Sequence, residues 1–218
     1  MIDPFRLCVA FGPLAIYCLL LGLINLLRRP VLITGAKDMA VLTAALAGLV
    51  VIGPLELFMP EAAAMRFGGY VWLLLLSFYG LSVSLVLLLS RPRLVIYNIS
   101  SEQLRPILGE IVPSLDSQAR WAGDSLAMPT LGVQLHIDNF PSMRNVSLVA
   151  NGERQSFEGW RRLEKALAGA LRQKSWESYH PRGMVLITTG LLLLVACCFA
   201  SLSDPQALAQ GMRDLLRL

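Results

Sequence analysis

Charged residues are scarce in this sequence and unevenly distributed. They make up 16% of the 218 residues, whereas 55% are hydrophobic and the mean hydropathy is +0.59. An ordinary soluble domain has about 25% charged residues. Four long runs carry almost no charge, while the stretch from Arg91 to Arg182 has the mixture of a soluble α+β domain. The sequence therefore predicts an integral membrane protein with one water-facing domain.

The sequence also lacks the patterns of common catalytic and cofactor sites. It contains no P-loop, no dinucleotide-binding glycine motif and no Ser/His/Asp order. Histidine occurs only at His136, on the polar phase of an alternating stretch, and at His180, next to a proline. We therefore predict no metal ligand, no cofactor and no catalytic residue. An enzyme acting on lipid stays open as a weaker alternative.

Cysteine patterns typical of zinc or redox sites are absent as well. The four cysteines are Cys8, Cys18, Cys197 and Cys198, all within apolar runs. Their favoured interpretation is as small apolar residues packed between helices. The alternative is a disulfide of Cys8 with Cys197 or Cys198, which the predicted topology places toward the same membrane face.

Four apolar runs have the length of about 20 residues that is needed to cross a hydrocarbon core of about 30 Å. They cover residues 7–27, 39–59, 70–90 and 183–203. Arg28 and Arg29 follow the first run in place of a cleavage site, which favours a permanent helix over a signal peptide. We interpret the segment from Arg28 to Asp38 as a loop that ends in Asp38 as a helix N-cap.

The second run contains two further features. Small residues recur at helical spacing and predict close helix packing: Thr43, Ala44, Ala47 and Gly48. Glu56 is the one ionisable residue within a predicted span, three residues from its end and after Pro54. An intramembrane carboxylate suggests a proton or ion site. The alternative is an interfacial carboxylate that is hydrated or bonded to a tyrosine or serine.

Residues 204–218 predict a short amphipathic helix. Asp204 and Pro205 have the types preferred at a helix start. The apolar positions then recur one or two turns apart: Leu208, Met212, Leu215 and Leu216. Such a helix suits the membrane interface, although docking on the protein's own spans would give the same pattern.

The net charge of +4 is explained by basic residues at the ends of the apolar runs rather than by a nucleic-acid patch. More Lys and Arg lie on the side of the water-facing domain, which predicts a cytoplasmic domain and both termini outside, in a bacterial inner (plasma) membrane. The predicted membrane-edge anchors are Arg28, Arg29, Arg91, Arg93, Trp176 and Arg182. Two glycosylation sequons, at Asn98 and Asn145, would be used only if the domain were lumenal.

The water-facing domain is predicted to span residues 94–178. A strand at 94–99 is followed by Ser100 and Gln103 at capping-box spacing and by a helical apolar pattern. Further strands are predicted around a Gly123 turn, at 133–138 and at 146–150, and a second helix at 157–171. We therefore expect an antiparallel sheet covered on one face by two helices, with core positions for the aromatic residues Trp121, Phe140 and Trp160.

These features lead to two functional hypotheses. The first is a non-catalytic multi-pass protein whose cytosolic domain docks other membrane-protein subunits or a second copy, as a scaffold, assembly factor or accessory subunit. The second is a transporter or ion-translocating subunit that uses Glu56. The lipid bilayer is the expected environment in both, and nucleic acid is not an expected partner.

Overall fold

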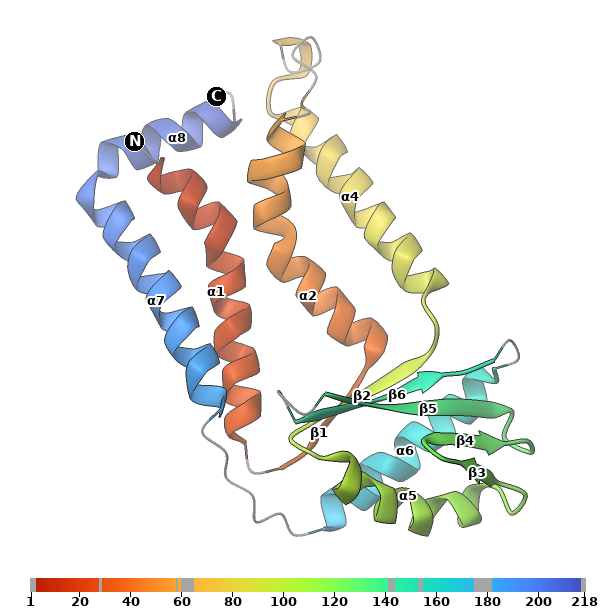
Figure 1. The fold of residues 1–218 in the computed structure, drawn as a ribbon. Coiled ribbons are helices and arrows are strands. Elements are labelled where there is room, and N and C mark those ends of the chain that lie inside the picture. Colours follow the sequence, from red (N-terminus) through yellow and green to blue (C-terminus); the bar gives the residue numbers. More distant parts are fainter. Residues whose placement is uncertain are drawn as a thin grey trace. The chain divides into compact units, whose positions relative to one another are not determined.

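The fold was analysed in a computed structural model, which describes residues 3–27, 29–57, 59, 65–140, 144–152, 155–174 and 182–216 (Figure 1). The chain forms two compact units. The helical unit comprises Met1–Leu23, Met39–Leu89 and Gly183–Leu218. The α+β unit comprises Ile24–Asp38 and Ser90–Arg182. The chain thus enters the α+β unit twice, once between the first two apolar runs and once between the last two.

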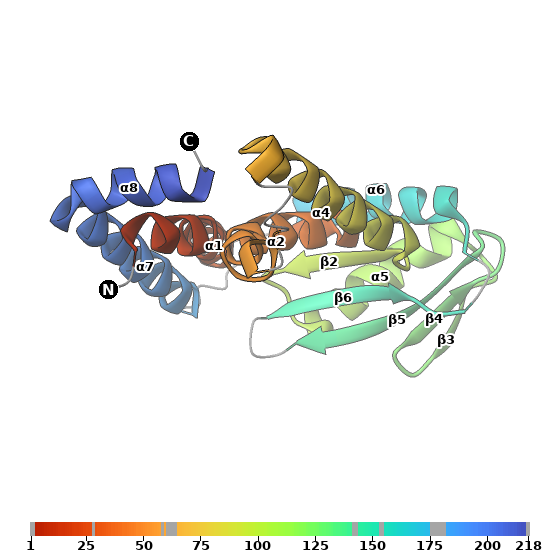
Figure 2. The same ribbon diagram turned by 90° about the horizontal axis from the view of Figure 1, so that it is seen from above.

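The helical unit contains four helices that are long and apolar enough to cross a membrane, as the sequence predicts. They are α1 (Pro4–Leu26), α2 (Gly35–Val50) with its extension η1 (Val51–Leu55), α4 (Tyr70–Leu89) and α7 (Arg182–Ser203). The short α8 (Pro205–Leu216) follows α7. Figures 1 and 2 both show α7, α1, α2 and α4 side by side, in that order.

The second apolar run is not the single α-helix that was predicted for residues 39–59. The α-helix begins at Gly35 and ends at Val50, and a π-helical segment containing Pro54 continues to Leu55. Proline has no backbone N–H and its ring crowds the preceding turn, so the regular α-helical hydrogen-bond ladder is disturbed there. The wider π turn accommodates Pro54 and keeps the chain helical as far as Leu57.

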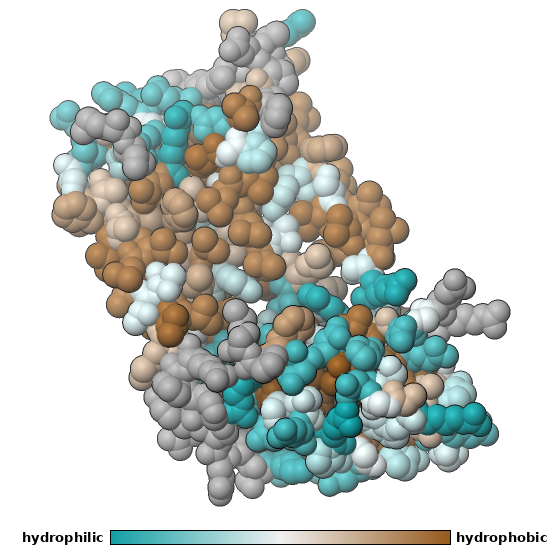
Figure 3. All heavy atoms as spheres, viewed as in Figure 1, coloured by the Kyte–Doolittle hydropathy of each residue, from teal (hydrophilic) through white to brown (hydrophobic). Residues whose placement is uncertain are grey.

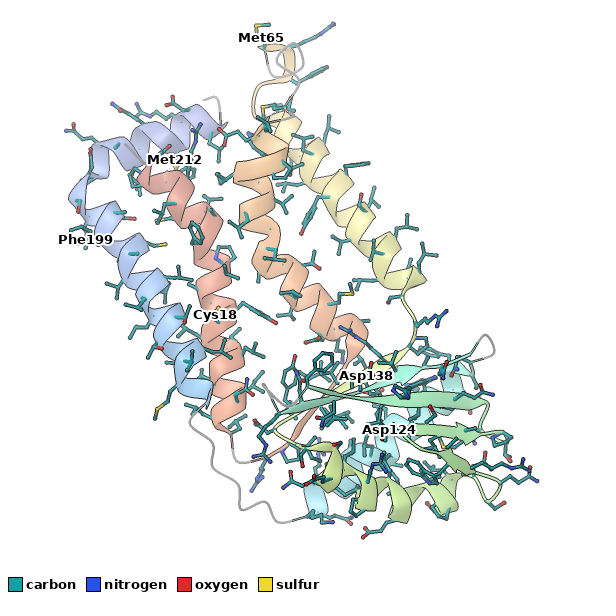
Figure 4. The ribbon with its side chains drawn as sticks, viewed as in Figure 1. Cys18, Met65, Asp124, Asp138, Phe199 and Met212 are labelled. Carbon is teal, nitrogen blue, oxygen red and sulfur yellow. The ribbon has the colours of Figure 1, made fainter. Side chains whose placement is uncertain are left out.

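Apolar side chains of the helical unit point outward. Leu88, Leu202 and Phe199 are 83%, 80% and 73% exposed, and Figure 4 shows Phe199 pointing away from the neighbouring helices. In Figure 3 the surface along these helices is largely hydrophobic, whereas that of the α+β unit is largely hydrophilic. Such large apolar patches are unusual in a soluble monomer and are compatible with lipid.

Glycines allow close approach of the helices in this unit. A Cβ atom on Gly48 of α2 would collide with the carbonyl oxygen of Val9 in α1, and one on Gly22 of α1 would lie 2.6 Å from Ile187 of α7. Small residues at such contacts let helix backbones pack closely where lipid gives no hydrophobic driving force.

The α+β unit is built on one antiparallel sheet of six strands in the order β1-β2-β6-β5-β4-β3. The strands are β1 (Val31–Thr34), β2 (Arg93–Tyr97), β3 (Arg120–Ala122), β4 (Ser125–Met128), β5 (Val133–Phe140) and β6 (Asn145–Ala150). Two helices, α5 (Ser101–Leu115) and α6 (Phe157–Gln173), share the core with the sheet.

Alternation along the strands explains the two faces of the sheet. Val133, Leu135 and Ile137 of β5 are buried in the core together with α5 and α6, while the residues between them are on the opposite face. We call the opposite side the outer face and the α5–α6 side the helical layer. The predicted two-helix cover of one sheet face is therefore confirmed.

The interpretation of residues 28–38 as a loop was wrong. Val31–Thr34 form the edge strand β1, which pairs with β2 from Val31 opposite Tyr97 to Thr34 opposite Leu94. Asp38 is also not an N-cap, because α2 begins at Gly35 and Asp38 lies in its first turn. Four apolar residues between Pro30 and Gly35 are too short a pattern to indicate a strand without its partner.

Two local predictions in this unit are confirmed. The Ser100 side chain accepts from the Gln103 N–H while the Gln103 side chain accepts from the Ser100 N–H, which completes the capping box of α5. Ala122 pairs with Ser125, which leaves a two-residue hairpin loop with Gly123 at φ +62°. Glycine adopts this left-handed conformation without steric cost.

Candidate functional site

The first turn of α2 is fixed to the outer face of the sheet. Arg93 and Tyr97 project from this face of β2, because Leu94 and Ile96 between them are in the core. The Tyr97 hydroxyl donates to Asp38 Oδ1 at 2.5 Å, and Arg93 Nη2 donates to Asp38 Oδ2 at 3.3 Å. The Arg93 side chain also occupies the space where a Cβ atom on Gly35 would lie. A larger residue at Gly35 would therefore force the Arg93 side chain to move away from its place beside Asp38.

Asn98 caps the end of α1. Its side-chain amide donates to the carbonyl oxygens of Ile24 at 2.6 Å, Leu27 at 3.0 Å and Arg29 at 3.4 Å. The last carbonyls of a helix have no partner within the helix, so these bonds satisfy them. A glycan on this amide nitrogen would break the cap, which makes the sequon at Asn98 incompatible with this fold. The second sequon residue, Asn145, is half-buried in β6.

The helical layer lies on the opposite side of the sheet from Asp38. Its surface contains a shallow hollow of about 370 Å³ between α5 and α6. It is lined by apolar side chains of both helices together with polar and charged ones: Ile107, Glu110, Ile111, Ala170, Gln173 and Lys174. A second open hollow, on α6, is lined by Phe157 and several charged residues. The surface of the helical layer thus combines shallow hollows, apolar side chains and charge.

Glu56, the candidate ion site, has an ionic partner. Its carboxylate forms an ion pair with Arg6 of α1, and Arg6 is also 3.6 Å from Asp3. The interfacial alternative predicted that Glu56 would be hydrated or bonded to a tyrosine or serine. The structure shows an arginine as its partner instead. Sequence reasoning missed the pair because fifty residues separate its members and no local pattern joins them.

The predicted helix-packing residues have different environments. Gly48 is buried against α1, Ala47 is half-buried and Ala44 is exposed. The Thr43 hydroxyl bonds to the Met39 carbonyl of its own helix, and the Thr43 carbonyl accepts from the Tyr79 hydroxyl of α4. The contact side of α2 is thus shared between α1 and α4.

The predicted membrane-edge anchors are only partly described. Arg29 and Arg91 are exposed, and Arg93 is in the cluster with Asp38. Arg28 and Trp176 lie outside the described residues, as does the side chain of Arg182.

The four cysteines are all free. The Cys8 sulfur lies 3.2 Å from Ser201 Oγ and 3.5 Å from the Cys197 carbonyl oxygen, so α1 and α7 approach closely here without a disulfide. The end of α8 is also held within the helical unit, because the Trp72 indole N–H donates to the Leu215 carbonyl at 2.7 Å. Docking on the protein's own helices, the alternative given for α8, is thus observed at this end.

A serine, a histidine and an aspartate meet on the outer face. Ser125 Oγ is 3.0 Å from His136 Nδ1, and His136 Nε2 is 3.5 Å from Asp138 Oδ1 (Figure 4 labels Asp138). Ser125 lies directly opposite His136 across β4 and β5. The His136 and Asp138 side chains are 44% and 45% exposed, and none of the hollows described for the chain is lined by them. We interpret this cluster as cross-strand polar pairing rather than an acyl-transfer site, which needs preorganised oxyanion donors.

Asp116 forms the one buried carboxylate site of the described chain. It is 3% exposed at the end of α5 and accepts from the backbone N–H groups of Gln118 at 2.9 Å, Thr130 at 2.7 Å and Leu131 at 3.1 Å. Burial raises the pKa of this carboxyl, but the hydrogen bonds outweigh burial and hold the pKa below its usual value. Asp116 joins two loops and has a structural role.

Two predicted core aromatics are at the surface. Trp121 and Phe140 are 42% and 52% exposed, whereas Trp160 is buried and its indole N–H donates to Gln155 at 2.9 Å. Trp121 belongs to the edge strand β3, and Phe140 falls on the outer phase of β5. The alternation of β5 could have placed Phe140 correctly.

Comparison with known proteins gives no relative. No family model, curated protein or solved structure matches the chain. Function is therefore argued from the geometry alone. Among the described residues no group of three or more His, Cys, Asp and Glu side chains could hold a metal ion.

Proposed function

We propose that this chain is a multi-pass protein of a bacterial plasma membrane whose α+β unit docks another subunit of a membrane complex, as a scaffold, assembly factor or accessory subunit. The observation that carries the proposal is the hollow between α5 and α6 in the helical layer. Within the α+β unit this layer lies on the opposite side of the sheet from the Asp38 cluster.

The sheet supports the predicted topology. β1 and β2 pair with each other and so must lie on the same side of any membrane. Two candidate spans, Gly35–Leu55 and Tyr70–Leu89, separate them along the chain. An even number of crossings returns the chain to the side from which it left. The pairing thus agrees with four spans and with the domain on the side where Lys and Arg are enriched.

The surface of the helical layer supports docking. The hollow between α5 and α6 is lined by apolar and polar side chains side by side, a mixture that is also found at non-obligate protein contacts. The unit is also linked to the four apolar helices where α1, α2, α4 and α7 end or begin. Attachment at several points lowers the orientational freedom that a partner would have to remove on binding.

Site-specific photo-crosslinking in cells tests this proposal. A benzophenone amino acid replaces Gln173, which lines the hollow, or, as a matched control, Gln134 on the outer face. We expect one discrete protein adduct from position 173 and none from position 134. The adducted protein should co-purify with the wild type in mild detergent and be lost when Ala170→Arg fills the hollow. Equal adducts at both positions, or none at 173, would refute docking through the helical layer.

Ion translocation through Glu56 is the second candidate. Its specific support is the π-helical segment directly before Glu56, a deviation that is frequent at functional sites. The ion pair with Arg6 argues for a structural role instead. Reconstituted vesicles with the wild type, Glu56→Gln or the control Glu102→Gln separate these interpretations. Transport predicts that only Glu56→Gln abolishes proton flux, and unchanged flux would remove the transport hypothesis.

A further inference from the structure

One side of α6 carries a line of cations. Arg161, Lys165 and Arg172 are exposed, and at 3.6 residues per turn they lie within about a quarter of the helix circumference. Phe157, 80% exposed, continues the line at the N-terminal end of the helix. We call these four residues the cationic stripe. Leu163 and Leu167, on the other side of α6, are fully buried in the core.

The stripe is not neutralised within the described chain. Glu158 lies beside it but is engaged by Arg162 at 2.5 Å, an i,i+4 pair of the same helix. None of the described carboxylates forms an ion pair with Arg161, Lys165 or Arg172. The open hollow on α6, about 460 Å³, lies between Phe157 and Lys165. The stripe therefore offers uncompensated positive charge next to an exposed aromatic ring.

The residues around the stripe bear on which anion it binds. A lipid headgroup is the alternative, and the identity of the crosslinked product in the test below separates it from a protein. Glu158 and Glu164 interrupt the line of cations, so an evenly charged phosphate backbone fits it less well than a segment whose negative charges are spaced along its length. An acidic protein segment can place its carboxylates between these glutamates and its apolar side chains over Phe157.

We infer that the cationic stripe binds an acidic segment of the partner protein, an inference that rests on the docking function proposed above. The stripe covers the sixteen residues from Phe157 to Arg172, and the fifteen rises of 1.5 Å between its ends make it about 22 Å long. An acidic helix of about fifteen residues or an extended segment of about seven residues matches this length. Exposed charges chiefly steer encounter and select partners, so binding should weaken as salt rises.

The test uses the full-length protein in its own cells with a benzophenone amino acid in place of Phe157. We expect a protein adduct whose crosslinked peptide, sequenced by mass spectrometry, is rich in Asp and Glu. Adding Arg161→Glu with Lys165→Glu should lower the adduct yield at least tenfold. The matched pair Arg105→Glu with Arg120→Glu, exposed elsewhere on the same unit, should change it less than twofold.

Each other result overturns the inference. An adduct with lipid or nucleic acid, an adduct peptide without excess acid, or equal loss from both double variants would exclude an acidic protein segment. No adduct from position 157 would do the same. The crosslink from position 173 then decides the wider question: if it persists, docking stands without the stripe, and if it is absent as well, both proposals fail.

Discussion

Leu163 of α6 and Leu192 of α7 are both leucines in the middle of a helix, but they differ in exposure because they belong to different units. Leu163 is fully buried between helix and sheet, whereas Leu192, midway along its helix, is 70% exposed. The contrast extends throughout: the α+β unit encloses a continuous apolar core, and the helical unit leaves leucines at its surface. Burial from water stabilises one unit, while the other has the surface of a protein whose solvent is itself apolar.

The comparison assumes that the apolar helices cross a membrane and that α8 and the α+β unit lie on opposite sides of it. Labelling from outside the cell tests this assumption most directly. The native cysteines are first replaced by serine or alanine, and single cysteines are introduced as Asn151→Cys in the α+β unit or Gln206→Cys in α8; both sites are exposed. A membrane-impermeant maleimide should label position 206 in intact cells and position 151 only after lysis. Labelling of position 151 from outside would reverse the predicted topology.

Truncating one leucine in each unit sharpens the comparison. Leu163→Ala opens a cavity in a closed core and should destabilise the α+β unit by about 2–5 kcal/mol. The matched Leu192→Ala shortens an exposed side chain that we expect to contact lipid. It opens no internal cavity, so stability should change by about 0.5 kcal/mol or less. Unfolding in lipid nanodiscs is followed in variants that keep one buried tryptophan, Trp160 for the α+β unit or Trp72 for the helical unit. Equal losses would show that Leu192 is packed rather than lipid-facing.

Acid should affect the α+β unit through Asp116. Because the folded-state pKa of this carboxyl is lowered, its stabilising contribution is present above the unfolded value of about 3.9 and is lost as pH falls through the folded value. The wild type should therefore be more stable than Asp116→Asn near neutral pH, and this difference in stability should shrink as the pH falls below about 4. Thermal unfolding of both proteins between neutral pH and pH 3 measures this. A constant difference between them would contradict the assigned hydrogen bonds.

The smallest expected effect of a change in the α+β unit concerns the Asn98 cap at the end of α1. Asn98→Gly keeps the left-handed backbone at φ +62° but removes the cap of α1, at a cost of about 1 kcal/mol. Hydrogen exchange at residues 24–27 should accelerate, while exchange in the core strands stays unchanged. Asn151→Gly, at an exposed turn, is the matched control and should leave residues 24–27 unaffected.

Local patterns in the sequence were sufficient for much of this fold. The four apolar runs, the capping box at Ser100 and the alternation of β5 each predict their element because the signal lies within a few neighbouring residues. The turn at Gly123 follows from the conformational freedom of glycine.

Features that depend on distant partners were not predictable. β1 is a strand only because β2 lies beside it, sixty residues later in the chain. Arg6 and Glu56 meet because α1 packs against α2, and Ser125 reaches His136 through the strand register. The stripe on α6 was visible as a polar helix face, but its lack of internal partners required the packed structure.

The edge strand β1 also sets an order of events during synthesis. Its partner β2 is made only after two further apolar helices have left the ribosome, and β2 in turn must wait for β6 before the sheet can close. Until then Val31–Thr34 lack the partner strand with which they pair in the folded unit. A fragment of residues 94–178 would lack this strand permanently and would expose the open edge of β2, a surface prone to pair with other chains.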